Sequence, residues 1–245
     1  MPALNSAAAD RPAERPLRDE LAVRRPHWPP FNRGLLIVAG IFLAAAVLVA
    51  IAVQLGGFHS MDQQVLRYLQ GRGSTGQDVA LALLSYLGGI EVTLAVAVVL
   101  GVALFKGLRL LAVGPALLLL LASGIEFAGK HLVHQLAPPA SALRWPSFLP
   151  HLTHQVGVYS FPSGHVMRST ILYGLVLYLA DRWELFGKDS SRLSPVLAIL
   201  AVLMAYAVLY LGWHWFADAV GGALLGLAIL LAAIAFLERR RLVKP

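Results

Sequence analysis

Apolar residues along the chain form six long runs separated by short polar segments. A helix needs about 20 apolar residues to cross the hydrocarbon core of a bilayer. The pattern therefore predicts an all-α, polytopic membrane protein whose six transmembrane helices form one bundle. Gly88, Gly89 and Glu91 interrupt the second run, so we expect that run to begin as an interfacial helix. The six predicted spans are 34–56, 79–105, 110–129, 165–181, 195–213 and 218–237.

Both ends of the chain are polar and basic. Residues 1–33 are rich in Arg, Ala and Pro and show no apolar periodicity, which predicts a disordered cytoplasmic tail. A cleaved signal peptide over 1–56 is the alternative, but its apolar run is longer than a signal sequence uses and lacks a clear cleavage site. The predicted organisation is thus a tail over 1–33, a membrane domain over 34–237 and a second basic tail over 238–245.

Composition agrees with a membrane protein. The chain is 58% hydrophobic and 13% charged, whereas a soluble domain has about 25% charged residues. The chain has no cysteine, which excludes disulfides and thiolate metal sites. The net charge of +7 could indicate a nucleic-acid partner. The basic residues instead flank the apolar runs, which is a topology signal, so no nucleic acid is expected.

The distribution of basic residues predicts the orientation. Six spans place both termini on one side, together with fifteen of the twenty Lys and Arg residues. Lys and Arg concentrate in cytoplasmic loops, so the termini are predicted to be cytoplasmic in a cell (inner) membrane protein. The segments 57–78 and 130–164 then face the outer, periplasmic side. Seven of the eight histidines fall on that side, so we expect the chemistry there.

The segment 159–165 carries the first candidate site and reads Tyr-Ser-Phe-Pro-Ser-Gly-His. Pro162 favours a helix start that Ser163 can cap. Such a helix N-terminus presents unpaired N–H groups and a positive dipole end, which bind anions. Gly164 lets an anion approach the backbone, and His165 lies in the first turn. A capped helix with an incidental histidine is the alternative.

His214 and Asp218 form the second candidate site. They are four residues apart and would share one face of a helix. A carboxylate beside an imidazole fixes its tautomer and raises its basicity, so His214 could act as a nucleophile or a base. The alternative is a structural pair at the membrane interface, where Trp213 and Trp215 would form an aromatic belt.

Lys130, at the end of the third apolar run, is the third candidate. Glu126 precedes it by four residues, the favourable order for an ion pair along a helix. Snorkelling of Lys130 to the membrane interface is the alternative.

In this order and spacing, the three motifs resemble the type 2 phosphatidic acid phosphatase family, which includes bacterial membrane lipid phosphatases and undecaprenyl diphosphatases. The family pattern is a Lys separated by six residues from Arg-Pro, then Pro-Ser-Gly-His, then Ser-Arg-x5-His-x3-Asp. The resemblance covers about residues 60–237. It implies the helical bundle of that family and a lipid phosphate as substrate, with no cofactor and no metal.

The resemblance also implies a role for each candidate residue. His214 would attack phosphorus and form a phosphohistidine, and Asp218 would orient it. His165 would protonate the leaving oxygen and later activate water. The phosphate oxygens would be held by Lys130 and by the backbone of Ser163 and Gly164.

The sequence departs from the family pattern at both arginines. Ala137 stands at the first Arg position and Val208 at the second. A hydrogen bond to a charged group contributes about 1.5–3 kcal/mol, so another cation is expected to compensate. Arg168 is the best candidate for phosphate binding, because it lies one helical turn after His165 and an intramembrane Arg is costly. Snorkelling of Arg168 is the alternative, and Arg144 is a weaker candidate.

The histidine pairs in the predicted outer segment could indicate zinc. Loop histidines without a nearby carboxylate are weak ligand sets, so no metal site is predicted. A role in binding the phosphate headgroup is the other interpretation. The pairs are His131 with His134 and His151 with His154.

The predicted function is a membrane lipid phosphatase that hydrolyses a lipid phosphate or diphosphate at the outer face. Two alternatives stay open. One is a degenerate family member that binds lipid phosphate without turnover, which the missing arginines favour and the retained histidines oppose. The other is a lipid-linked phosphotransferase, in which an acceptor other than water takes the phosphoryl group.

Overall fold

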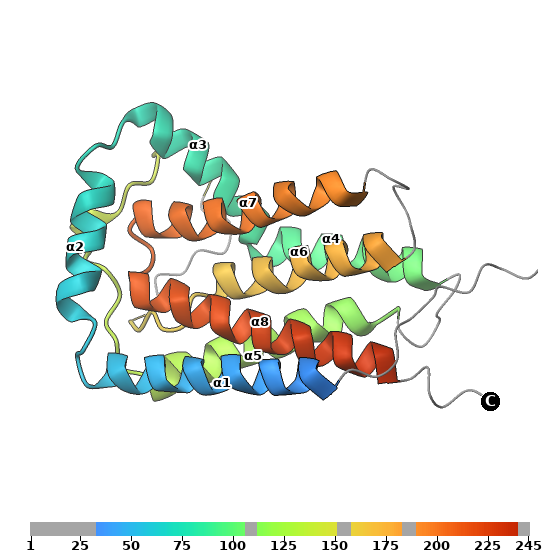
Figure 1. Cartoon of the computed structure of the whole chain (residues 1–245). Coiled ribbons are helices and arrows are strands. Elements are labelled where there is room, and N and C mark those ends of the chain that lie inside the picture. Colours follow the sequence, from blue (N-terminus) through green and yellow to red (C-terminus); the bar gives the residue numbers. More distant parts are fainter. Residues whose placement is uncertain (1–32, 106–111, 151–157, 183–189, 240–245) are drawn as a thin grey trace, which may run out of the picture.

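The computed structural model describes residues 33–105, 112–150, 158–182 and 190–239. Within these ranges the chain is all-helical and contains no strand, as predicted (Figure 1). Short 3-10 turns, η1 (Tyr86–Gly88) and η3 (Ala140–Ala142), accompany the helices. The α-helices are α1 (Arg33–Gln54), α2 (His59–Gln70), α3 (Thr75–Ser85), α4 (Ile90–Phe105), α5 (Gly114–Leu132), α6 (Gly164–Arg182), α7 (Ser190–Tyr210) and α8 (Phe216–Arg239).

The predicted tails fall almost entirely outside the described residues. At the C-terminal boundary, α8 continues to Arg239, two residues past the predicted end of the membrane domain. At the other end, α1 begins at Arg33, one residue before the predicted start.

The described helices contain four or five candidate membrane spans. In α1, α5, α7 and α8 a stretch is long and apolar enough to cross a bilayer. A fifth span arises if α3 with η1 is joined to α4, from which it is bent by 46°. The break at Gly88 and Gly89 was expected. The predicted span 165–181 became α6, which does not meet the same criterion of length and apolarity.

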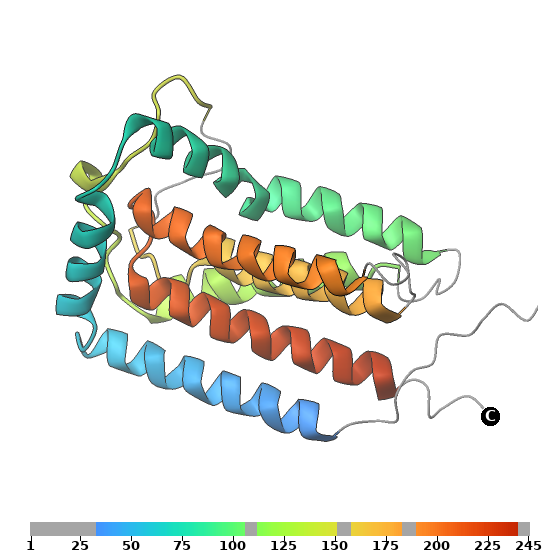
Figure 2. The ribbon, with the colours of Figure 1, turned by 45° about the horizontal axis from the view of Figure 1, so that its top comes forward.

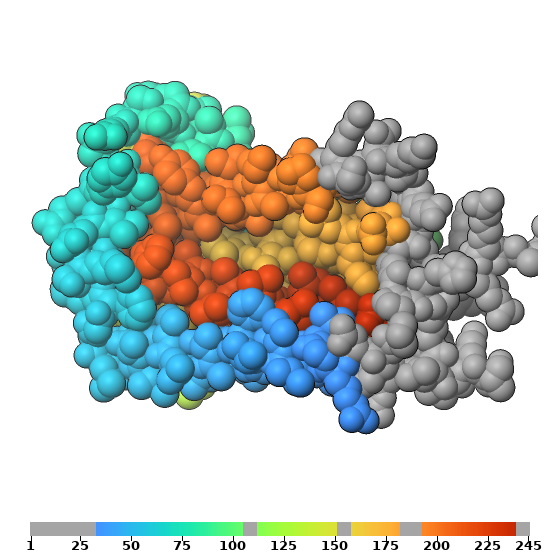
Figure 3. Space-filling view, in the orientation of Figure 1, coloured from blue at the N-terminus to red at the C-terminus, as the bar shows by residue number. Residues whose placement is uncertain are grey.

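Helix α6 carries more polar residues than the other spans, and other helices surround it. No side chain from His165 to Ala180 is exposed, and α4, α5, α7 and α8 all contact this helix. In the space-filling view, α6 is visible between α7 and α8 (Figure 3). By contrast, α1 packs along α8 at the periphery (Figure 2) and exposes a row of large apolar side chains, including Leu36, Ile41 and Leu48. A polar helix can therefore sit inside the bundle while the outer helices face lipid.

Small residues bring α6 and α8 close together. A methyl group added at Gly222 of α8 would collide with the carbonyl oxygen of Ser163, just before α6. One added at Gly174 of α6 would collide with Leu230. Close approach through small residues is a common way for membrane helices to pack. It fixes the start of α6 against α8.

One end of the bundle is covered by α2, which lies across the ends of the other helices (Figure 1). The sequence predicted only an outer segment over 57–78, so this helix was missed. Its most buried side chain is Asp62, which is 2% exposed, while Met61 and Tyr68 are exposed. Met61, Val65 and Leu69 recur at helical spacing, so the apolar stripe of an amphipathic helix was present in this outer segment but was not used in the prediction.

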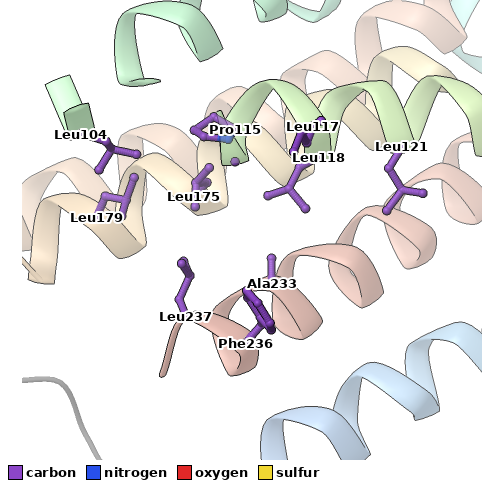
Figure 4. Close-up of a pocket in the computed structure, with 11 residues that line it drawn as sticks. Leu104, Pro115, Leu117, Leu118, Leu121, Leu175, Leu179, Ala233, Phe236 and Leu237 are labelled. Atoms are coloured by element: carbon purple, nitrogen blue, oxygen red, sulfur yellow. The ribbon is translucent and has the colours of Figure 1, made fainter. Parts of the chain in front are cut away.

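The opposite end of the bundle contains an apolar cavity of about 330 Å³ (Figure 4). Helices α4, α5, α6 and α8 line it, and no lining residue carries a polar side chain. The candidate motifs lie elsewhere: α5 ends, and α6 and α8 begin, at the end of the bundle that α2 covers (Figure 1). The lining includes Leu104, Leu118, Leu175, Leu179, Phe236 and Leu237.

Candidate active site

The turn between α7 and α8 positions His214. Helix α7 ends at Tyr210, and Gly212 adopts a φ of 72°, a left-handed conformation that favours glycine at a helix C-terminus. The N–H groups of Trp213 and His214 then both donate to the carbonyl oxygen of Val208, at 3.0 and 3.3 Å. His214 is 5% exposed. The nucleophile candidate is therefore held by backbone hydrogen bonds in a buried turn.

Asp218 lies in the first turn of α8 and is fully buried. Its Oδ2 accepts a hydrogen bond from the N–H of Trp215 at 2.8 Å and lies 3.3 Å from Nδ1 of His214. The expected pair thus forms, but the prediction of a shared helix face was wrong, because His214 precedes the helix. With Nδ1 directed at the carboxylate, Nε2 is the nitrogen left for chemistry.

The Pro-Ser-Gly-His segment is tied to the same turn. The N–H of Ser163 donates to the carbonyl oxygen of Asp218 at 3.0 Å, and its carbonyl accepts from Met167 at 3.1 Å. Helix α6 begins at Gly164, as predicted. The predicted side-chain cap was wrong: the buried Ser163 hydroxyl has no hydrogen-bond partner among the described residues. A backbone bond, and not the hydroxyl, joins the two motifs.

His165 is half-buried in the first turn of α6. Its ring centroid lies 5.2 Å from that of Trp213, the residue before His214. Trp213 in turn stacks on Trp145 at 5.1 Å. Two segments about fifty residues apart in the sequence thus bring both histidines to one end of the bundle.

The predicted cations meet on one carboxylate. Nζ of Lys130 lies 2.8 Å from Oε1 of Glu126, which confirms the predicted ion pair. Nη1 of Arg168 lies 2.5 Å from Oε2 of the same side chain. Arg168 is 5% exposed, so it does not snorkel to an interface. Its Nε also donates to the carbonyl oxygen of Gly88 at 3.4 Å. The structure therefore brings Arg168 and Lys130 together at the start of α6.

A family model for the PAP2 superfamily matches residues 109–242, more than half of the chain. The chain belongs to the PAP2 superfamily. This is the family that its motifs resemble. Phosphatidylglycerophosphatase B of Bacillus subtilis (strain 168) is 33% identical over 95 residues, which are 38% of this chain and 46% of that protein. The match thus spans about half of the length of this curated relative.

The fold agrees with the same family. The crystal structure of a transmembrane PAP2-type phosphatidylglycerolphosphate phosphatase from Bacillus subtilis superposes with a TM-score of 0.70. The match covers 84% of this chain and 97% of that one at 21% sequence identity. The helical bundle described above is thus a PAP2 membrane phosphatase fold.

The two family arginine positions have structural roles in this PAP2 chain. Ala137 donates its N–H to the carbonyl oxygen of Val158 at 3.1 Å, beside a short antiparallel bridge. Val208 is fully buried in the core, and its carbonyl oxygen holds the turn that carries His214. Neither position offers a charge to a phosphate.

The Arg144 side chain is engaged by Asp78 of α3. Its guanidinium lies 2.8 and 3.1 Å from the two carboxylate oxygens of Asp78 and stacks over the ring of Tyr210 at 5.2 Å. A two-point pair of this kind is geometrically specific. Arg144 therefore joins α3 to the end of α7.

Asp62 contributes to the site although the sequence did not single it out. Its Oδ1 accepts the N–H of Ala217 at 2.9 Å, and its Oδ2 accepts Nε2 of Gln135 at 2.8 Å. Burial raises the pKa of Asp62, and the nearby charge of Asp218 raises it further. Asp62 satisfies a free N–H group at the start of α8 and so positions the helix turn that contains Asp218.

Two of the four histidines considered as zinc ligands make contacts with neighbouring protein groups. His131 places Nδ1 2.8 Å from the carbonyl oxygen of Phe127, and the His134 ring lies 5.0 Å from that of Tyr159. His151 and His154 lie outside the described residues. In the part of the chain that the structure describes, no three His, Asp or Glu residues are grouped to hold a metal ion.

Proposed function

We propose that this PAP2 chain is a membrane lipid phosphatase that hydrolyses a lipid phosphate or diphosphate ester through a phosphohistidine. The observation that carries the proposal is the pairing of Nδ1 of His214 with the buried Asp218, next to Ser163 and to a site with two cations. The carboxylate holds one tautomer and stabilises the imidazolium that forms during attack. Such an arrangement activates a nucleophile without help from solvent.

The reaction proceeds in two balanced steps. Nε2 of His214 bonds to phosphorus while the bond from phosphorus to the lipid oxygen breaks, and His165 gives its proton to that oxygen. Water then attacks the phosphohistidine, His165 takes a proton from the water, and the N–P bond breaks to release phosphate. One histidine serves as acid in the first step and as base in the second.

The substrate is held as an anion. Lys130, Arg168 and the backbone N–H groups at the start of α6, including that of Gly164, surround the phosphoryl oxygens. The name of the B. subtilis relative makes phosphatidylglycerophosphate the first substrate to test. Phosphatidate and a polyprenyl diphosphate present the same chemistry on other lipids. Because Ala137 and Val208 remove two family cations, binding without turnover is the second candidate.

Phosphate release by the detergent-purified protein tests the activity. The panel contains phosphatidylglycerophosphate, phosphatidate and a polyprenyl diphosphate, each with the native chain and His214→Ala. We expect release by the native chain and a loss of about 10³-fold or more in the variant, as for other covalent nucleophiles. Release that survives His214→Ala contradicts the mechanism. Binding of the lipids with no release from any of them would favour the second candidate.

We also propose that the bundle has six spans, including α6, with both termini cytoplasmic and the site at the outer face. The start of α1 and the end of α8, next to the basic terminal segments of the sequence, lie at the end of the bundle opposite α2 (Figure 1), which supports this orientation under the positive-inside rule. The chain has no cysteine, so single cysteines can be labelled cleanly in intact cells. An impermeant thiol reagent should label Arg72→Cys and not Asp181→Cys, and the reverse pattern would invert the orientation.

A further inference from the structure

The start of α6 already holds an anion, and that anion is the side chain of Glu126. The carboxylate lies so close to Gly164 that a methyl group at this glycine would collide with it. The start of a helix attracts a negative charge through its free N–H groups and its dipole. Glu126 comes from α5, so this contact also joins α5 to α6.

The same carboxylate bridges both cations assigned to phosphate binding. One oxygen pairs with Lys130 at 2.8 Å and the other with Arg168 at 2.5 Å. A phosphoryl group bound at the start of α6 would use these two cations and the N–H groups in the same way. Two anions in this small space would also repel each other strongly.

From this geometry, and resting on the proposed function, we propose that Glu126 is a built-in competitor of the phosphoryl group. In the resting protein its carboxylate fills the phosphate position, and substrate binding displaces it from Arg168. Lys130 lies one turn along the same helix and can keep its contact with Glu126 or pass to the phosphate.

The resting arrangement has a clear physical reason. Two cations without an anion in a largely buried site are costly, because neither is fully hydrated. Glu126 offsets one of their two positive charges until the substrate arrives, so the site remains folded when empty. The same charge weakens the binding of another anion, which makes Glu126 a determinant of affinity.

Inorganic phosphate is the probe that tests the competition. Its apparent Kd is obtained from the rise of the thermal-unfolding midpoint with phosphate concentration, since a ligand of the folded state raises that midpoint. The purified full chain is compared with Glu126→Gln, which keeps the shape of the side chain and removes its charge. Asp78→Asn is the matched control, because it removes a carboxylate from Arg144 and leaves Lys130 and Arg168 untouched.

We expect Glu126→Gln to unfold at a lower temperature than the native chain without phosphate and to recover as phosphate is added. Its apparent Kd for phosphate should be about tenfold lower or more, the size of one charge-assisted contact regained. Asp78→Asn should lose stability with no change in this Kd. An unchanged or higher Kd in Glu126→Gln overturns the proposal.

Glu126→Asp covers the case in which the glutamine variant does not fold. The side chain of this variant is one methylene shorter, so its carboxylate cannot reach both cations. We therefore expect its Kd for phosphate to decrease as well, but by less than in Glu126→Gln. Failure of both variants to fold even in phosphate would also overturn the proposal, because phosphate would then not replace the carboxylate. None of these measurements needs turnover. A native chain that hydrolyses no lipid, together with the expected change in Kd, refutes the proposed activity and leaves the competition intact.

Discussion

The two halves of the candidate site are built in different ways. Backbone hydrogen bonds hold the nucleophile half: Val208 fixes the turn of His214, and Asp218 binds the N–H of Trp215 and the segment before α6. Ion pairs between side chains hold the cations of the other half, where Lys130 and Arg168 share Glu126. The two arginines that the family has and this chain lacks, at Ala137 and Val208, would both have belonged to the cation half. A half held by the backbone preserves its geometry, whereas a half made of side chains can exchange its partners.

Asp218→Asn should cause the largest loss, because it disturbs the half that depends on geometry. The amide can no longer stabilise the imidazolium of His214, and a comparable change in a catalytic triad costs about 10⁴-fold in kcat. Single-turnover hydrolysis of the preferred lipid measures the effect. Asp181→Asn, an exposed aspartate near the far end of α6, is the control and should retain the native rate. A kcat within about tenfold of native in Asp218→Asn would show that Asp218 is not the partner of the nucleophile.

Arg168→Ala should have the next largest effect and reports on the cation half. Losing one charge-assisted contact of about 1.5–3 kcal/mol lowers kcat/KM by about 10- to 100-fold. Arg144→Ala is the comparison, since it removes a guanidinium at the same end that pairs with Asp78. It should lower the unfolding temperature and leave kcat/KM near native. Unchanged kinetics in Arg168→Ala would mean that this residue does not replace a family arginine.

Gly222→Ala tests whether the contact between α6 and α8 holds the two halves together. The added methyl group meets the carbonyl oxygen of Ser163, and overpacking of this kind costs about 1–3 kcal/mol. Thermal unfolding and kcat should both decrease. Gly40→Ala, in α1 with no atom within 4 Å of the new methyl group, should leave kcat unchanged and should not lower the unfolding temperature, because Ala favours a helix interior over Gly. Equal behaviour of the two variants would contradict the role of the close helix contact.

Asp62→Asn should produce the smallest effect, visible as a dependence of stability on pH. Burial raises the pKa of Asp62 above its ordinary value of 3.8. Below 3.8 the carboxyl is protonated in both folded and unfolded chains. As the pH rises through the raised pKa, ionisation destabilises the folded native chain, while the amide has no charge to gain.

The unfolding temperature of Asp62→Asn should therefore increase relative to that of the native chain as the pH rises through this window. Any difference from altered hydrogen bonds with Ala217 or Gln135 is independent of pH and leaves the trend intact. If the unfolding temperature of Asp62→Asn instead decreased relative to that of the native chain as the pH rises, the folded state would favour the ionised carboxylate. Asp181→Asn should show no such trend, because that side chain is exposed.

Local spacing predicted much of this molecule. The apolar runs located α1, α5, α7 and α8 to within a few residues, and the four-residue interval between Glu126 and Lys130 predicted their ion pair. These features depend on residues that are neighbours along one helix. The His214–Asp218 pair was also found from its spacing, although His214 lies in the turn at Gly212, between α7 and α8, and not in a helix.

Contacts between distant segments could not be predicted in the same way. Arg168 and Glu126 are 42 residues apart, and Asp62 and Ala217 are 155 apart. Each contact depends on how whole helices pack, which residue spacing does not encode. Helix α2 is a different case: its apolar residues recur at helical spacing, so the helix itself could have been predicted, whereas the contacts of Asp62 with Gln135 and Ala217 on other elements could not.

The central claim is that His214 carries the phosphoryl group during turnover, and trapping that intermediate tests it most directly. The native chain is mixed with a lipid substrate labelled at its phosphate, quenched in alkali within one turnover and separated from lipid. A phosphohistidine survives alkali and is lost in acid. We predict label on the native chain that is alkali-stable, acid-labile and absent from His214→Ala. Label that persists in His214→Ala, or hydrolysis by the native chain with no labelled protein at any time, would contradict the account.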